Sequence, residues 1–146
     1  MSSLLRHRNL ALLLLQARES VMAEFRPLLN EHGLTEQQWR VIRALLQDGP
    51  LEPRQLCERC QIVSPSLTGV LARMEELDLV TRERMADDQR RLRVSLTARS
   101  KRIAAKMAPH VEARYAALER DLGPELTAQL YATLDLLLER LAKRSR

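Results

Sequence analysis

The residues best suited to chemistry in this sequence are cationic and small polar side chains gathered between positions 64 and 93. Five arginines stand close together, at Arg82, Arg84, Arg90, Arg91 and Arg93. Guanidinium groups of this kind bind phosphates and the acceptor edge of guanine. Small polar residues and one more arginine precede them on a segment whose apolar residues have helical spacing: Ser64, Pro65, Ser66, Thr68, Gly69 and Arg73. The pattern therefore predicts a surface that binds a polyanion.

Each half of this pattern has a simpler interpretation when it is considered alone. Ser64, Pro65 and Ser66 could mark only the start of a helix, and the arginines could be a solvated face. Together and in this order they favour DNA binding, because a purely structural hairpin tip rarely concentrates so much positive charge.

A helix-turn-helix followed by a β-hairpin would position these residues. A short helix from Pro53 to about Cys60 precedes a second helix, for which we expect Ser64 as the N-cap and Asp78 as the end. From Leu79 to Leu96 the alternation of side chains predicts a hairpin with a charged tip. The second helix would enter the major groove of DNA, and the hairpin would reach the flanking backbone or the minor groove.

Two further helices are predicted before this unit. Residues 4–31 read as one long helix that is apolar on every side between Leu12 and Leu15, so a second subunit is expected to cover it in a homodimer. Thr35 and Gln38 predict a capping box at the start of a helix that runs to about Gln47. The residues expected to be buried on that helix are Trp39, Ile42, Leu45 and Leu46.

The end of the sequence is predicted to be helical as well. Thr97 is the expected cap of a long helix that Pro109 would kink, and Gly123-Pro124 separates it from a last helix that ends at residues 143–146.

Bulk composition narrows the function classes. The chain has 146 residues and a net charge of +5, which suits one globular domain with a polyanionic partner. The apolar run at 10–15 is too short for a signal peptide or a membrane span, so we expect a cytoplasmic protein that does not bind membranes. No phosphate loop, zinc-protease motif or nucleophile elbow is present, and we therefore expect neither an enzyme nor a cofactor.

The two cysteines, Cys57 and Cys60, allow two interpretations. Inward packing of both thiols on the short helix is the simpler one, and a thiol-responsive switch is the alternative. The three histidines lie far apart in the sequence without ligand spacing, so no metal site is expected.

The sequence resembles the MarR family of bacterial regulators. The Val94-Ser95-Leu96-Thr97 junction and the order of the elements carry the likeness. Segments 15–19, 25–27, 34–40, 65–69 and 88–91 are similar to the subgroup that represses homoprotocatechuate (4-hydroxyphenylacetate) degradation operons. The resemblance implies a mainly α fold, a winged helix-turn-helix at 32–96, and dimerisation helices at 1–31 and 97–146, all in one domain.

The resemblance also implies specific site residues. Asp87 occupies the position expected for the family's minor-groove arginine, so Arg84, Arg90 or Arg91 would replace it, with Gln89 beside them. A small phenolic acid would bind with its carboxylate on Arg18 and its ring in an apolar slot formed by Met22, Phe25, Trp39 and Ile42. The alternatives are that Arg18 pairs with a glutamate across the dimer and that Trp39 belongs to the core. A non-specific architectural DNA binder is the alternative function.

Overall fold

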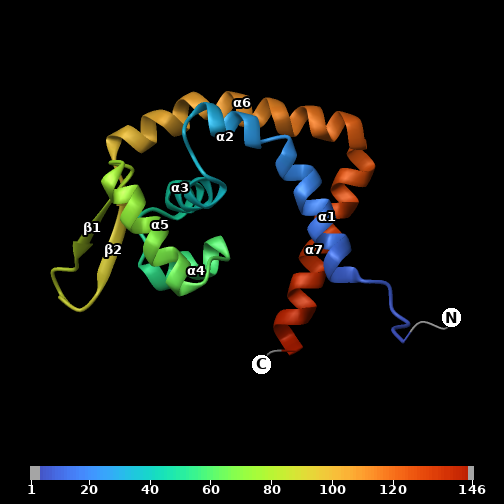
Figure 1. Cartoon of the computed structure of the whole chain (residues 1–146), viewed down its shortest axis with the longest axis horizontal. Coiled ribbons are helices and arrows are strands. Elements are labelled where there is room, and N and C mark those ends of the chain that lie inside the picture. The colour runs from blue at the N-terminus through green and yellow to red at the C-terminus, as the bar shows by residue number, and fades with distance from the viewer. Residues whose placement is uncertain (1–3, 145–146) are drawn as a thin grey trace. The chain divides into compact units, whose positions relative to one another are not determined.

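The computed structural model describes residues 4–144 (Figure 1). The helices are α1 (Leu10–Ala23), α2 (Arg26–Glu31), α3 (Glu36–Asp48), α4 (Pro53–Cys60), α5 (Ser64–Glu76), α6 (Ala98–Leu122) and α7 (Pro124–Arg144), and the strands are β1 (Val80–Arg84) and β2 (Leu92–Leu96). The chain divides into two compact units, 1–108 and 109–146, whose boundary falls at Pro109 within α6. The mainly helical class with a small hairpin is confirmed; residues 145–146 of the predicted last helix lie outside the described part of the chain.

The predicted single helix over residues 4–31 is wrong. Helix α1 begins only after Asn9, whose side chain accepts a hydrogen bond from the Leu12 amide at 3.0 Å, and it ends at Ala23. A new helix starts at Arg26 with Pro27 in its first turn. Proline lacks an amide hydrogen and clashes with the preceding turn, so a helix accepts it only near its beginning. The chain therefore breaks the helix at Glu24-Phe25.

Helix α1 has no buried residue in the single chain. Its leucines at positions 10 and 12–15 are 36–57% exposed. Helix α7, considered by itself, also contains no buried residue and exposes Leu126, Leu130, Tyr131 and Leu138. So much exposed apolar surface marks an interaction site, and in a protein of this size a second copy of the chain is the simplest cover.

Helices α3, α4 and α5 pack against the hairpin around a compact core. The buried face of α3 consists of Gln38, Val41, Ile42 and Leu45. The expectation that Trp39 and Leu46 are buried with them is wrong: Trp39 is half-buried and Leu46 is 49% exposed. These two residues are seven positions apart, so they share a neighbouring stripe of the helix. The predicted capping box at Thr35 and Gln38 is confirmed.

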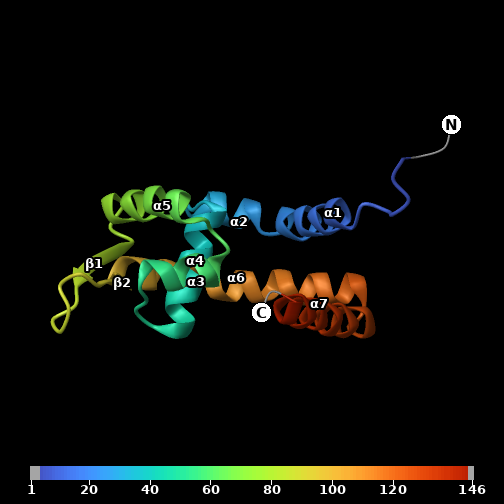
Figure 2. The same ribbon diagram turned by 90° about the horizontal axis from the view of Figure 1, so that it is seen from below.

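Strand pairing and a bridge to Leu51 hold the hairpin in place. Its strands pair antiparallel from Val80 opposite Leu96 to Arg84 opposite Leu92. Leu51 adds a short bridge, in which the Val94 amide donates to the Leu51 carbonyl at 2.7 Å. In Figures 1 and 2 the hairpin tip projects away from α3, α4 and α5. The core thus holds the base of the hairpin and leaves its tip free.

The start of α6 confirms Thr97 as the cap. The Thr97 hydroxyl accepts from the Ser100 amide, and the Ser100 hydroxyl accepts from the Thr97 amide, both at 3.1 Å. Ser100 is fully buried, so this reciprocal cap satisfies two amides that have no partner within the helix.

We predict that Leu71→Ala destabilises the protein by about 2–5 kcal/mol, because Leu71 on α5 is 2% exposed and its truncation leaves a cavity. Urea unfolding at one fixed protein concentration measures this change. Ser66→Ala, an exposed change on the same helix, should stay within about 0.5 kcal/mol. Equal effects of the two changes would contradict the packing of α5.

Candidate nucleic-acid interface

Helix α5 presents a polar face to solvent. Six predicted contact residues on it are exposed: Ser64, Pro65, Ser66, Thr68, Gly69 and Arg73. The opposite face is buried through Leu67, Leu71 and Met74. Since successive buried residues are three or four positions apart, the polar residues between them must point outward.

The ends of α5 differ slightly from the prediction. Val63, and not Ser64, is the N-cap, and no side chain caps the first turn. The helix ends at Glu76, followed by Asp78 in the left-handed region at φ 57°. The Ser64 carbonyl accepts a hydrogen bond from the Thr68 hydroxyl at 3.1 Å. Amides in an uncapped first turn are well placed to bind a phosphate.

Gly69 has no steric reason inside the chain to be glycine. A Cβ atom built there would meet nothing within 4 Å, and its backbone is helical. Glycine in a helix interior costs about 1 kcal/mol relative to alanine. Its outward position keeps the middle of the polar face flat, which suits the close approach of a partner.

The wing, which we define as residues 80–96, holds its arginines in different ways. Arg84 donates to the Gln89 carbonyl at 3.2 Å and thereby braces the tip. Arg90 is 92% exposed, and both its backbone amide and its Nε donate to Asp88 Oδ1, at 3.0 and 3.3 Å. Arg90 is thus far more exposed than Arg91 and Arg82, whose side chains are 49% and 30% exposed.

The other two paired arginines of the wing are tied to helices. Arg82 forms two hydrogen bonds with the Glu75 carboxylate at the end of α5, at 3.0 and 3.2 Å. These bonds hold the pKa of Glu75 below its usual value. Arg91 donates Nε to Glu52 Oε1 at 2.7 Å, and its Nη2 contacts the same oxygen. Sequence reasoning missed Glu52, which is 39 residues from Arg91, and Glu75, which lies on α5 whereas Arg82 lies on the next strand.

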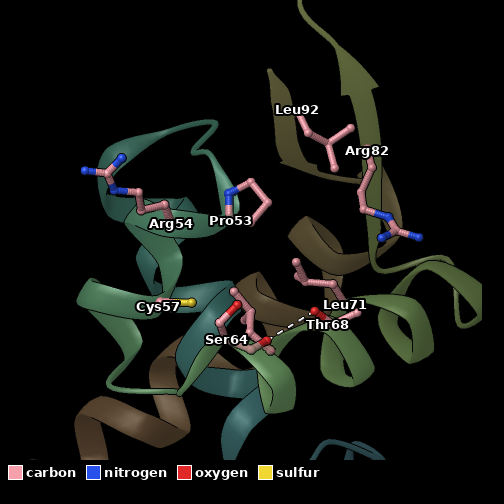
Figure 3. Close-up of a pocket in the computed structure, with 9 residues that line it drawn as sticks. Pro53, Arg54, Cys57, Ser64, Thr68, Leu71, Arg82 and Leu92 are labelled. Atoms are coloured by element: carbon pink, nitrogen blue, oxygen red, sulfur yellow. Dashed lines mark hydrogen bonds between the residues drawn. The ribbon is translucent and has the colours of Figure 1, made fainter. Parts of the chain in front are cut away.

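A groove of about 470 Å³ lies between α4, α5 and the hairpin. Figure 3 shows Cys57, Ser64, Thr68 and Arg82 around it, with Leu71 and Leu92 at its apolar side. The groove therefore brings the polar face of α5 and the strands of the wing onto one surface.

The two cysteines have different environments. Cys60 is buried, its thiol donates to the Arg40 carbonyl at 3.5 Å, and burial raises its pKa. Cys57 is half-buried and lines the groove, so the expectation that both point fully inward is wrong for Cys57. Arg40, which sequence reasoning also missed, donates to the Cys60 carbonyl at 2.7 Å at the end of α4.

The residues predicted to bind a phenolic acid belong to the first unit. Phe25 and Ile42 are buried, whereas Met22 and Trp39 are half-buried. Arg18 is paired within the chain: it contacts Glu19 at 3.1 Å and Glu36. Arg26 binds the same two carboxylates, at 2.6 and 3.1 Å. This four-residue ionic cluster joins α1, α2 and the first turn of α3.

The described residues also bear on metal binding and on membrane crossing. Within residues 4–144, no three metal-ligating side chains lie close enough together to hold a metal ion. None of the helices in this range has both the length and the apolar composition that a bilayer crossing requires.

Comparison with known proteins places this geometry in context. Residues 32–91 match the MarR family. The chain is 41% identical to the HTH-type transcriptional regulator FarR of Neisseria gonorrhoeae, over 82% of each chain. It is 40% identical to the homoprotocatechuate degradative operon repressor of Escherichia coli, over 88% of this chain and 87% of that one. The crystal structure of NadR in complex with 4-hydroxyphenylacetate is 39% identical, with a TM-score of 0.80, and the match covers 94% of this chain and 97% of that one.

We predict that the ionic cluster makes stability depend on acid pH. Hydrogen bonds from Arg18, and then from Arg26, lower the pKa of Glu36 from its ordinary value of 4.5. A lowered pKa in the folded state contributes stability above the unfolded value, and this stability is lost as the pH falls through the folded value. Glu36→Gln should therefore lower the free energy of unfolding by about 0.5–1 kcal/mol at neutral pH, and the difference from wild type should shrink steadily as the pH falls below the ordinary value of 4.5.

Urea unfolding between pH 7 and pH 3 checks this dependence. Glu31→Gln, an exposed carboxylate at the end of α2, serves as the matched control and should follow the wild-type curve. A constant gap between Glu36→Gln and wild type across the pH range would disprove the ionic origin of the effect.

Proposed function

The chain belongs to the MarR family, and on this premise we propose that it is a DNA-binding repressor of an aromatic-acid catabolic operon, released from DNA by a small phenolic acid. The family resemblance drawn from its motifs is confirmed. The observation that carries the proposal is the exposed polar face of α5 beside an arginine-bearing wing. A repressor requires a DNA-binding surface of this kind and does not require catalytic residues.

The proposed DNA contacts divide into two groups. Ser66, Thr68 and Arg73 on α5 are placed to read base edges in the major groove, with Ser64, Pro65 and Gly69 allowing close approach. In the wing we propose Arg90 as the arginine that reaches the flanking DNA, since its side chain is 92% exposed at the tip. Arg84, Gln89 and Arg91 shape the wing around it.

The repressor acts as a homodimer. MarR regulators bind DNA as dimers, and the leucines of α1 form an apolar surface that a second copy would cover. A two-fold dimer presents two α5 helices, so its operator should contain two half-sites in inverted orientation, about one helical turn apart.

The proposed effector is a hydroxylated aromatic acid. NadR binds 4-hydroxyphenylacetate, and the Escherichia coli relative represses homoprotocatechuate degradation. In this chain Arg18 would hold the carboxylate, and Met22, Phe25, Trp39 and Ile42 would enclose the ring. Because Arg18 already binds Glu36, the effector carboxylate would have to take the place of Glu36. That exchange would remove the direct link between α1 and the first turn of α3 and leave only the link through Arg26, which offers a route from the ligand to the DNA-binding unit.

We predict that Arg90→Ala weakens binding to operator and random DNA by the same factor. The change removes one phosphate-neutralising cation, so the slope of log affinity against log salt should become shallower by about 1. Fluorescence anisotropy between 50 and 200 mM salt measures both quantities. Arg59→Ala is the control. It removes one positive charge near the C-terminal end of α4, where Arg59 is paired with Asp48 of α3. An unchanged slope for Arg90→Ala would exclude Arg90 from DNA contact, and equal wild-type affinity for operator and random DNA would indicate an architectural binder.

We predict that 4-hydroxyphenylacetate stabilises the protein and releases it from the operator. At about 100 times its dissociation constant, a ligand stabilises the fold by about 2.7 kcal/mol. Arg18→Gln should abolish the thermal shift, whereas Arg26→Gln disrupts the same ionic cluster without removing the proposed carboxylate contact and should retain the shift. 4-Methylphenol, which lacks the carboxylate, should have little effect. A full response from Arg18→Gln would show that another residue holds the carboxylate.

A further inference from the structure

Glu52 joins the wing to the start of the helix-turn-helix. It is the N-cap of α4 and forms a capping box with Gln55, whose side chain accepts from the Glu52 amide at 2.9 Å. Its carboxylate receives two N–H groups of Arg91, although 39 residues separate the two positions in the sequence. A glutamate that is already ordered by the cap thus determines where Arg91 points.

The position of this pair gives it an electrostatic consequence. The first helix of a helix-turn-helix crosses the DNA backbone, and the N-terminus of a helix attracts phosphate. A carboxylate at this N-terminus opposes that attraction. It also neutralises Arg91, which would otherwise add an uncompensated charge to the wing. A paired arginine releases few counterions when DNA approaches, since its charge is already compensated.

Arg90 and Arg91 therefore differ in exposure and in how they are paired with an acid. Arg90 is 92% exposed and contacts Asp88 through Nε at 3.3 Å, so its two Nη groups remain available to a phosphate. Arg91 is 49% exposed and is anchored to α4, outside the wing. Arg90 and Arg91 are adjacent in the sequence, but of the two it is chiefly Arg90 that is exposed to a binding partner.

We propose that Glu52 is a positioning residue that limits the sequence-independent part of DNA binding by keeping Arg91 paired. Phosphate contacts act equally on every sequence, and a genome offers a vast excess of non-specific sites. Because Glu52 keeps one cation from binding DNA phosphates, less of the repressor is bound at non-specific sites and more of it is available for the operator. This inference rests on the proposed function, because it presupposes that the wing meets DNA.

The test compares Glu52→Gln with Glu58→Gln on a random-sequence duplex. Both changes remove one negative charge from α4, but only Glu52 binds Arg91. We expect Glu52→Gln to raise affinity for random DNA about three- to tenfold over Glu58→Gln at 50 mM salt, and to steepen the salt slope by about 0.9. The double change Glu52→Gln with Arg91→Gln, which has the net charge of the wild type, should return both values to those of the wild type.

Arg91→Gln in the wild-type background gives an independent measurement that does not require Glu52→Gln to fold. We expect it to alter the salt slope by much less than 0.9, because the pair is nearly neutral. A loss of about 0.9 would show that Arg91 binds phosphate despite Glu52, and it would overturn the inference. Equal behaviour of the two glutamate variants would overturn it as well, while leaving the repressor function intact. Absence of any wild-type DNA binding would instead overturn the proposed function, and this inference with it.

Discussion

Burial of one face of α5 is the constraint on which the rest of the binding surface depends. Leu67, Leu71 and Met74 are almost completely inaccessible to solvent, so the helix has only one way to rotate about its axis. Turning it by a quarter would expose these side chains and bury hydroxyls without partners, and both changes cost free energy. The outward position of Ser66, Thr68 and Arg73 is thus a result of core packing.

The same core also positions the wing. Val80 and Val94 are buried on the hairpin, and the bridge between Val94 and Leu51 adds backbone hydrogen bonds to the segment before α4. Two ion pairs, Arg82 with Glu75 and Arg91 with Glu52, then tie the hairpin to the helices on either side of the groove. Exposed ion pairs contribute little stability, so their effect lies mainly in deciding which cations face outward. This selection makes the binding surface less positive than the count of arginines suggests.

Helix α1, unlike α5, buries no residue in the core of the single chain. Its leucines remain exposed in the single chain, and its polar residues Arg18 and Glu19 join the ionic cluster with Arg26 and Glu36. The helix that a second subunit is expected to cover is therefore connected by charge to the first turn of α3, and α3 packs directly on α4 and α5. A ligand that competes for this cluster would act at the junction between dimerisation and DNA binding, which is a physically direct way to couple the two.

The sequence alone determined the helices of the DNA-binding unit, the hairpin and the polar face of α5, because these depend on local signals. Capping at Thr35, the proline at Pro53 and the apolar spacing in α5 each act over a few residues. The break before Pro27 is local as well, because a helix accepts proline only near its beginning. The half-buried state of Trp39 and the pairing of Arg91, in contrast, were decided only by the tertiary structure. Glu52 and Arg91 meet because the hairpin folds back onto α4, and no local pattern encodes a contact across 39 residues. The sequence could thus name the cations of the wing, but only the folded chain determines which of them are already paired with an acid.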